Sequence, residues 1–248
     1  MHMNHAFSMT VEKLLDLELP KRVEYIRVLV AELQRIASHL LAVGTFGLDV
    51  GAITPFQWTF RDRERILDLF EQLCGARLLY NYIWPGGVSH DLPPNFIDHT
   101  IEFIDYFEPN IDELNDVLTT NKIFIERSAD VGILPADVGI NFGVSGPSLR
   151  GSGINWDLRK NEPYSVYDKF DFNVPVGKGE MGTVGDCWDR YYVRVLEMKE
   201  SIKIIRQACD GLPEGDVHEV MPKKIRPDAG EVYSRYESAR GDVGFYII

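Results

Sequence analysis

The sequence predicts a mainly α-helical fold, a multi-helix bundle that carries an irregular, loop-rich insertion and a small amount of β structure. Four segments repeat apolar residues with a helical period, residues 132–182 show no long helical period, and the last residues resemble a strand. With 248 residues, 45% of them hydrophobic, the chain can bury a large core. We therefore expect residues 1–248 to form a single helical-bundle domain with residues 132–182 as a loop-rich segment within it.

The first predicted helix covers residues 21–51. Its apolar positions recur at spacings of four and three, at Ile26, Val30, Leu33, Ala37 and Leu40. Glycines 44, 47 and 51 weaken or end its far part. A second helix is expected up to residue 75, with Thr54 as N-cap, Pro55 at the first helical position, and Ile66, Phe70 and Leu73 turned inward. The charged run 61–65 is interpreted as its solvent-exposed face.

Two further helices and the irregular parts follow. Isoleucines 97, 101, 104 and 111 indicate a helix over residues 95–118, which Pro109 should kink or interrupt. Residues 121–130 can form a short helix, and a long one is expected over residues 185–210. Within the loop-rich segment we expect short strands at residues 167–174. Residues 244–248 are interpreted as a strand whose partner is absent.

Composition excludes several classes of function. The net charge of −12 repels phosphate backbones and anionic lipid headgroups, so a nucleic-acid partner is not expected. No stretch approaches the roughly 20 apolar residues of a membrane-spanning helix, and no signal peptide is recognisable, which indicates a cytoplasmic chain without a transmembrane segment. Cys74, Cys187 and Cys209 lack C-x-x-C spacing and are interpreted as reduced, mostly buried thiols, so no zinc ribbon or cysteine-bound cluster is predicted.

A polar stripe on the first long helix is the main candidate site. Glu32, Arg35 and His39 follow at spacings of three and four and share one flank, with Asp49 at the end of the same helix. The stripe predicts either a helix-borne site or a structural ion-pair network, because Glu and Arg one turn apart stabilise each other. Asp49 lies between apolar and glycine residues, where a buried carboxylate would have a raised pKa and could handle protons.

The other motifs of the sequence give weaker indications of function. Residues 177–182 match G-x-G-x-x-G, but no strand follows the next helix as a dinucleotide fold requires. The histidines lack the spacing of a metal site, so no metal is predicted. Asp186 and Asp189 begin the last helix, where the helix dipole favours carboxylates, and Arg190 is expected to pair inside the bundle.

Two segments, residues 149–160 and 186–191, combine charged, aromatic and glycine residues too densely for plain surface or plain core. With further blocks in the same order, the chain resembles the D-subunit family of respiratory complex I, the NADH-quinone oxidoreductase, whose fold is shared with the large subunit of nickel–iron hydrogenases. The blocks are residues 11–15, 25–29, 48–52, 75–77, 86–88, 149–160, 164–168 and 185–191. The resemblance implies a bundle of the hydrogenase large-subunit type.

It also implies a function. Members of this family form, in the peripheral arm of a proton-pumping complex, a quinone chamber together with a subunit that carries a 4Fe4S cluster. Electrons pass from that cluster to quinone, and menaquinone is a compatible substrate. The resemblance implies that this chain alone binds no cofactor. The expected partners are the iron–sulfur cluster subunit, other complex I subunits, quinone, and the cell membrane, on whose cytoplasmic side the complex would hold this peripheral chain.

The resemblance assigns roles to individual residues. Asp49 matches an acidic residue near the quinone chamber and is expected to take part in the proton chemistry. His39, Arg35 and Glu32 match a polar helix face that would support the chamber from behind. Structural or subunit contacts are expected from Arg150, Asp157, Arg159, Asp186, Asp189 and Arg190.

Three departures from the family matter. The family's quinone-binding tyrosine and a β loop with a histidine precede the position of Met1, and a final segment follows residues 244–246. We therefore expect a member truncated at both ends that cannot reduce quinone alone. Leu79 and Trp84 stand where many members have a histidine and an arginine near the cluster, which predicts a cluster potential that depends little on pH.

Two rival functions are left to weigh. A non-catalytic helical scaffold or assembly fragment of the same complex would use the stripe from Glu32 to Asp49 as a salt-bridge network only. An active hydrogenase would need paired cysteines near both ends to hold nickel and iron, and none of the three cysteines has that spacing. Quinone-dependent activity separates the first rival from the main hypothesis.

Overall fold

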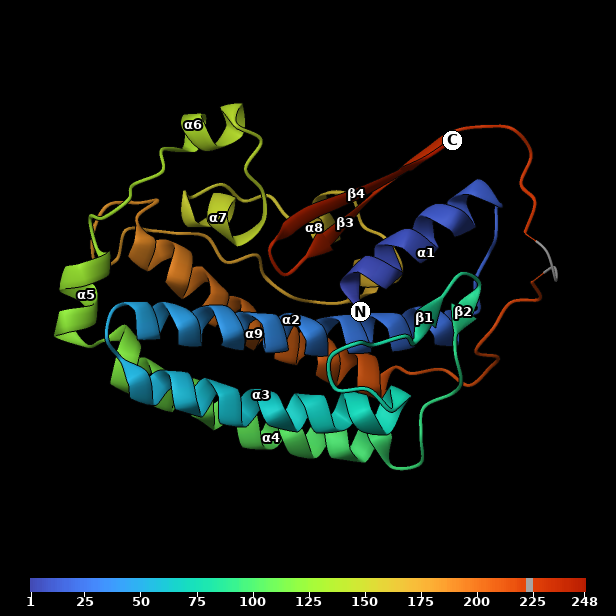
Figure 1. The fold of residues 1–248 in the computed structure, drawn as a ribbon, viewed down its shortest axis with the longest axis horizontal. Coiled ribbons are helices and arrows are strands. Elements are labelled where there is room, and N and C mark those ends of the chain that lie inside the picture. Colours follow the sequence, from blue (N-terminus) through green and yellow to red (C-terminus); the bar gives the residue numbers. More distant parts are fainter. Residues whose placement is uncertain (222–224) are drawn as a thin grey trace.

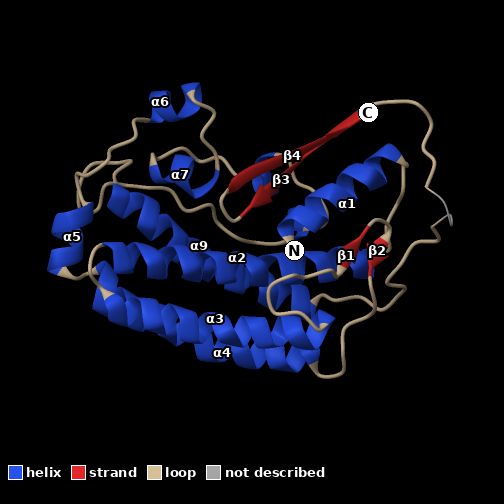
Figure 2. Cartoon of the chain, in the orientation of Figure 1, coloured by secondary structure: helices blue, strands red, loops and turns tan. Residues whose placement is uncertain are grey.

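The computed structural model describes residues 1–221 and 225–248, and it confirms a mainly helical fold with minor β structure. Figure 2 shows that the strands of these described residues form two short pairs. The long helices are α1 (His2–Leu14), α2 (Lys21–Asp49), α3 (Ile53–Cys74), α4 (Phe96–Leu114) and α9 (Cys187–Asp210). α2 lies in the middle of the molecule, with α3 and α4 on one side and α1 on the other (Figure 1).

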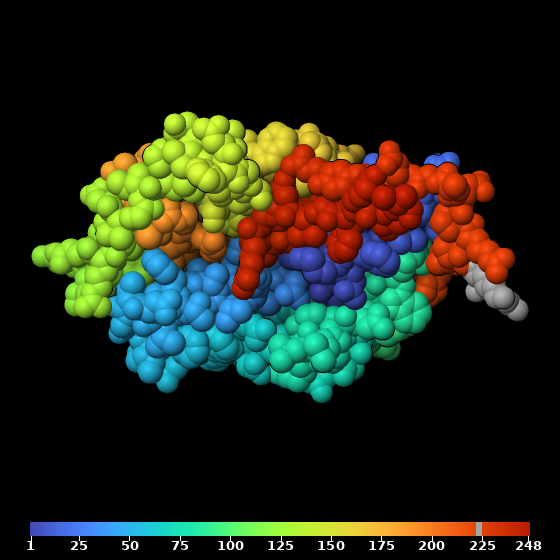
Figure 3. Space-filling view, turned by 45° about the horizontal axis from the view of Figure 1, so that its top comes forward, coloured from blue at the N-terminus to red at the C-terminus, as the bar shows by residue number. Residues whose placement is uncertain are grey.

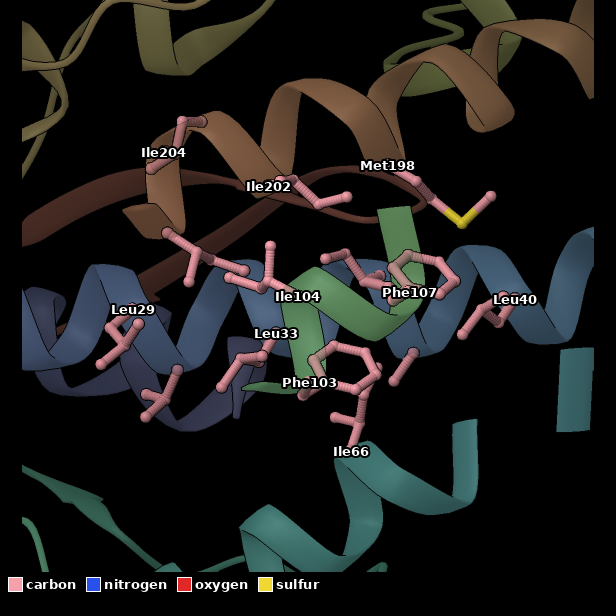
Figure 4. Packing of buried hydrophobic residues seen from close by; sticks show 14 of the residues in the cluster. Leu29, Leu33, Leu40, Ile66, Phe103, Ile104, Phe107, Met198, Ile202 and Ile204 are labelled. Carbon is pink, nitrogen blue, oxygen red and sulfur yellow. The ribbon is translucent and has the colours of Figure 1, made fainter. Parts of the chain in front are cut away.

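The core lies where α2, α3, α4 and α9 meet. Leu33 and Leu40 of α2 face Ile66 of α3, Phe103 and Phe107 of α4 and Ile202 of α9, as Figure 4 shows, and all are buried. Each such side chain contributes about 1.5–3 kcal/mol by leaving water. α2 and α3 approach closely at Gly44, where a Cβ atom would lie 2.1 Å from Thr59 Oγ1. The central position of α2 explains why its polar flank is buried as well as its apolar one.

The predicted helices are found with adjusted ends. α3 begins at Ile53 with Ala52 as N-cap, so the prediction of Thr54 as the cap is wrong. Pro55 still fits because the first turn of a helix needs no intrahelical N–H. Gly75, with φ of 72°, ends α3 as expected. Asp62 is a second correction, because it lies buried in the charged run 61–65 and accepts a hydrogen bond of 2.9 Å from Tyr106 Oη.

α4 continues through Pro109 without interruption and passes into a π-helical turn, Asn115–Thr119. The short helix predicted next is α5 (Lys122–Ser128), capped by Asn121, whose side chain accepts hydrogen bonds from two backbone N–H groups. The π-helical turn was not predicted. Together these elements bring the chain back beside α9, with which α4 and α5 both pack.

The loop-rich segment holds three short helices and no strand. They are α6 (Ala136–Asn141), α7 (Gly146–Gly151) and α8 (Leu158–Asn161), followed by a 3₁₀ turn, Tyr167–Lys169. The predicted strands at residues 167–174 are wrong. The backbone N–H groups of Asp171 and Asn173 bind the side chains of Gln207 and Glu200 of α9, both at 2.8 Å, instead of a neighbouring strand.

The end of the chain also differs from the prediction. β3 (Val232–Ser238) pairs antiparallel with β4 (Gly241–Ile247), so the terminal strand has its partner within the chain. A second pair joins β1 (Ile83–Trp84) and β2 (Gly87–Val88). The β3–β4 hairpin packs on α1, a helix that was not predicted, and Figure 3 shows the hairpin at the surface beside α1.

Two further observations concern the chain as a whole. The three cysteines are free thiols, as expected, but they are only half-buried, which corrects the expectation of mostly buried side chains. Among residues 1–221 and 225–248, no helix combines the length and the apolar character that a membrane crossing requires.

Candidate functional site

Three cavities follow one another along α2 and α1, each sharing lining residues with the next, and together they are called the groove. The first, of about 520 Å³, lies between the end of α2, the start of α9 and the β3–β4 turn. The second, also about 520 Å³, shares Ser38, Ala239 and Arg240 with the first and extends to Leu79. The third, about 380 Å³, shares two residues of α1 with the second and reaches Trp84. The groove therefore runs from the end of α2 to the β1–β2 region.

α2 supplies one wall of the first cavity. Ser38, Ala42, Thr45 and Asp49 line it at spacings of four, three and four, which places them on one helix stripe. His39 lines it as well. The opposite wall comes from α9, from Ser148 of α7 and from the β3–β4 turn. The helical period of α2 thus aligns the residues that face the groove.

Asp49 is the last residue of α2 and lines the first cavity with an exposed side chain. Asp49 is therefore not enclosed by the apolar and glycine residues that flank it in the sequence. Its carboxylate forms no hydrogen bond or ion pair with any described residue. A carboxylate at the C-terminal end of a helix does not stabilise that helix, because the dipole there is negative. Helix stability thus gives no reason for a carboxylate at this position.

Glu32 and Arg35 are buried behind this wall in a network of ion pairs, and His39, which is part of the wall, joins the network through a hydrogen bond. Arg35 Nε lies 3.2 Å from Glu32 Oε2, and Arg159 Nη1 lies 3.2 Å from Glu32 Oε1. His39 Nε2 lies 2.7 Å from Glu197 Oε2. Tyr167 Oη and Ser201 Oγ also donate to Glu32, both at 2.6 Å. The stripe predicted on α2 is therefore part of an ion network whose partners come from distant segments.

Arg150 links the two ends of this network. Its Nε lies 2.7 Å from Glu197 Oε1, and its Nη1 lies 2.9 Å from Glu237 Oε1 and 3.5 Å from Asp157 Oδ2. Asp157 in turn pairs with Arg159 at 2.7 Å. All these side chains are at most 1% exposed. Of the two roles expected for these three charged groups, structural or subunit contact, the ion pairs within the chain fit the structural one.

The carboxylates of the network differ in their pKa values. Burial alone would raise the pKa of Glu32, but Arg35 and Arg159 outweigh it and the pKa falls to about 2. Burial raises the pKa of Glu237 to about 7, because Arg150 offsets the burial only in part and Asp157 adds repulsion. Burial also lowers the pKa of His39, against the opposing effect of Glu197. Glu237 is thus the carboxyl group of the network that can change its charge near neutral pH.

The residues at the start of α9 have local roles. Asp186 caps the helix by accepting the Asp189 N–H at 2.8 Å. Asp189 accepts the N–H of Gly179 at 3.0 Å, so this carboxylate occupies a backbone donor of the G-x-G-x-x-G loop. Arg190 Nη2 donates to the Gly132 carbonyl at 2.8 Å and does not pair with a carboxylate of the described chain. The expected ion pair of Arg190 inside the bundle is therefore wrong.

Sequence reasoning missed four charged residues of this region. Glu197 and Glu237 complete the buried network, and Arg194 and Arg240 line the first cavity. Glu197 lies next to Met198 on the buried side of α9, and a Glu among apolar helix positions was the available signal. In the described ranges, 1–221 and 225–248, no group of three or more His, Cys, Asp or Glu residues is arranged to hold a metal ion.

The comparison with known sequences decides the family. A sequence model of the family described as "Respiratory-chain NADH dehydrogenase, 49 Kd subunit" matches residues 49–228. The chain belongs to this family. The match begins at Asp49 and includes the network residues Arg150, Asp157 and Arg159 and the cavity residues Arg190 and Arg194.

Curated relatives agree with the complex I 49 Kd family. The chain is 57% identical to the NADH-quinone oxidoreductase D-subunit of Chlorobaculum tepidum, over 98% of this chain and 62% of the relative. It is 56% identical to the protein of the same name from Pelodictyon phaeoclathratiforme, over 100% of this chain and 63% of the relative. It is 53% identical to an NADH-quinone oxidoreductase D-subunit of Cytophaga hutchinsonii, over 100% of this chain and 65% of the relative. The chain spans a little under two thirds of the length of these relatives.

Proposed function

We propose that this chain forms one wall of a quinone chamber in the peripheral arm of an NADH-quinone oxidoreductase. It would help to transfer electrons from the 4Fe4S cluster of a neighbouring iron–sulfur subunit to quinone. The observation that carries this proposal is the groove, which joins Asp49 at one end to the exposed apolar residues Leu79 and Trp84 at the other. The names of the curated relatives support it.

The apolar end of the groove has the character of a subunit interface. Leu78, Leu79 and Trp84 are 63%, 89% and 44% exposed, and Met3 and Phe7 of α1 lie along the same cavities. Contiguous exposed apolar side chains on a water-soluble surface indicate a contact surface for another protein. In this proposal the iron–sulfur subunit covers this edge, closes the groove into a chamber and brings its cluster to the apolar end.

The other end of the groove suits a flat apolar ring. Ala42, Val43 and Phe46 of α2 and Tyr191 of α9 form the apolar part of the lining of the first cavity, and the rest of the lining is polar or charged. An apolar surface combined with polar groups that can fix the orientation of a ligand is typical of small-molecule sites. Asp49, exposed on this wall and free of protein partners within the described residues, would take or give a proton there. Arg35 and Glu32 would hold the wall from behind, and His39, which lines the cavity, would be fixed by its contact with Glu197.

The proposal includes a place in the cell. The complex would hold this peripheral chain on the cytoplasmic side of the cell membrane, through its other subunits. Proton movements at Asp49 and its neighbours would couple quinone reduction to the membrane arm. The rival is a non-catalytic scaffold of the same complex, favoured by one observation: Glu32 and Arg35 are fully enclosed and satisfied by their ion pairs.

Asp49→Asn in the assembled complex, isolated from membranes, tests the proposal. We expect normal assembly, normal reduction of an artificial electron acceptor, and a loss of quinone reduction of at least tenfold, because the amide keeps the shape but cannot take a proton. Asp171→Asn, at another exposed carboxylate, is the matched control. Quinone turnover equal to that of the control variant would overturn the role of Asp49 and leave the scaffold as the better interpretation.

A further inference from the structure

Three arginines surround the first cavity, and none of them forms an ion pair with a carboxylate in the described part of the chain. Arg190 and Arg194 lie one turn apart on α9, and Arg240 lies in the β3–β4 turn opposite. The hydrogen bonds of the two helix arginines go to backbone carbonyls and to Cys187 Sγ. Neither of these two charges is therefore neutralised by a direct contact with a carboxylate of the described residues.

These arginines are close enough to repel one another. Burial lowers the pKa of Arg194, Glu197 opposes this effect, and Arg190, Arg150 and Arg240 lower the pKa further. Glu197 is already bound to His39 and Arg150. Because arginine stays charged in proteins, the repulsion is not relieved by loss of a proton. An anion in the cavity would relieve it.

The remaining lining restricts the kind of anion. Asp49, His39, Cys187 and Tyr191 are the other titratable groups of the cavity, and only Asp49 adds a carboxylate, at the α2 end. The apolar wall formed by Val43, Phe46 and Tyr191 faces the same space. The cavity thus combines excess positive charge with an apolar surface, although the whole chain carries a net charge of −12. A small inorganic anion would leave the apolar wall uncovered.

We propose that this cavity is an oxyanion site that selects a flat aromatic ligand with a negatively charged oxygen group over the neutral form of the same ligand. The arginines would bind the oxyanion, and the residues of α2 would contact the ring. The site itself rests on the arginine cluster. Its biological ligand rests on the proposed function: it would be a reduced quinone ring with an ionised hydroxyl group, held until that oxygen is protonated.

Binding of three unreactive probes to the purified 248-residue chain tests the site. The probes are 2-naphthoate, its neutral isostere 2-naphthamide, and acetate, which carries the oxyanion without the ring. By titration calorimetry we expect 2-naphthoate to bind at least tenfold more tightly than either of the others. Equal affinity for 2-naphthoate and 2-naphthamide would overturn charge selection, and equal affinity for 2-naphthoate and acetate would overturn ring selection.

Two substitutions test whether the arginines of the cavity bind the oxyanion. Arg240→Gln alters an exposed turn residue, and we expect it to weaken 2-naphthoate binding three- to tenfold while 2-naphthamide is unaffected. Arg206→Gln removes the same charge from an exposed part of α9, where it pairs with Asp105 and Glu108, and should change neither affinity. An equal loss in both variants would show a general charge effect and overturn the proposal. Since these measurements need no turnover, they can succeed even if Asp49→Asn leaves quinone reduction intact.

Discussion

Leu79, an exposed residue at the groove, is expected to influence how the redox potential of the cluster in a neighbouring subunit depends on pH. It is 89% exposed at the apolar end of the groove, where the proposed iron–sulfur subunit would lie. In the assembled complex we expect the cluster potential to change little with pH. Leu79→His should introduce a pH dependence of up to about 59 mV per pH unit around the pKa of the new histidine, because the imidazole takes up a proton with the electron.

A redox titration of the assembled complex between pH 6 and 8, followed by electron paramagnetic resonance, would measure this slope. Ile123→His, at an exposed position of α5 away from the groove, is the control and should leave the potential unchanged. A full pH slope in the unsubstituted complex would contradict the prediction, since the proton would then be held by another group.

The raised pKa of Glu237 predicts that the stability of the folded chain depends on pH. Its pKa in the folded chain is raised from 4.5 to about 7, so its contribution is complete below pH 4.5 and is lost as the pH rises through 7. Glu32, with its pKa lowered to about 2, has the opposite sign and loses its contribution only as the pH falls from 4.5 to 2. Glu237→Gln mimics the protonated side chain. As the pH rises from 5 to 8, we therefore expect its melting temperature to increase by several degrees relative to that of the unsubstituted chain.

The comparison of the two melting curves isolates Glu237. The buried histidines, whose pKa values are lowered, titrate in both proteins and cancel in the difference. Glu108→Gln on the surface of α4 removes a carboxylate of an exposed ion pair and should show no pH-dependent difference. A constant difference between the curves of Glu237→Gln and the unsubstituted chain over this range would show that Glu237 stays ionised.

At the scale of elements, two glycines fix how the β3–β4 hairpin meets α7. A Cβ atom on Gly146, at φ of 64°, would lie 2.4 Å from Gly241 Cα and 2.8 Å from the Arg240 carbonyl oxygen. We expect Gly146→Ala to lower the free energy of unfolding by about 2 kcal/mol more than Gly143→Ala. Gly143 has a similar φ of 68° but open space around it, so its substitution costs the backbone strain alone.

Urea unfolding of the two variants measures the difference. Because the hairpin turn carries Arg240, Gly146→Ala should also weaken 2-naphthoate binding, whereas Gly143→Ala should not. Equal destabilisation by the two substitutions would mean that the hairpin moves away from α7 at little cost.

The elements that the sequence predicted well are those with a clean apolar stripe. α2 and α9 follow their helical period because their cores are formed by Leu, Ile and Val at regular positions. α1 was missed because it turns His5, Thr10 and Glu12 inward, so its buried face does not look apolar. β3 was missed for a similar reason, since Tyr236, Glu237 and Ser238 are buried consecutively instead of alternating.

At the scale of the molecule, the sequence predicted the part of the candidate site that lies on α2 but not the residues that this part contacts. The stripe on α2 was visible from local spacing, which cannot show what the stripe meets. His39 and Glu197 are 158 residues apart, and Arg150 and Glu237 are 87 residues apart. The segment 149–160 was recognised as unusual, but the sequence left its charges open between a structural role and a subunit contact. Only the packing of the loop-rich segment on α2 and α9 makes these residues one buried network.

The exposed apolar edge of the molecule predicts that the chain associates with itself when its partner subunits are absent. Leu78, Leu79, Trp84 and Met3 form a continuous apolar edge along the groove. Burial of such surface contributes about 25 cal/mol per Å², so the chain alone should cover this edge by self-association. We expect sedimentation velocity to show concentration-dependent oligomers, and the double substitution Leu78→Asp, Leu79→Asp to shift the chain to monomer.

The same two substitutions should prevent the assembled complex from retaining its iron–sulfur subunit, because two carboxylates would then be buried at the contact. Ile123→Asp places a carboxylate at an exposed apolar position outside this edge and should change neither self-association nor assembly. If the unsubstituted chain is monomeric, or if Ile123→Asp has the same effect, the edge is not an interface. Since the proposed chamber needs a second wall along this edge, that result would also remove the structural basis of the proposed function.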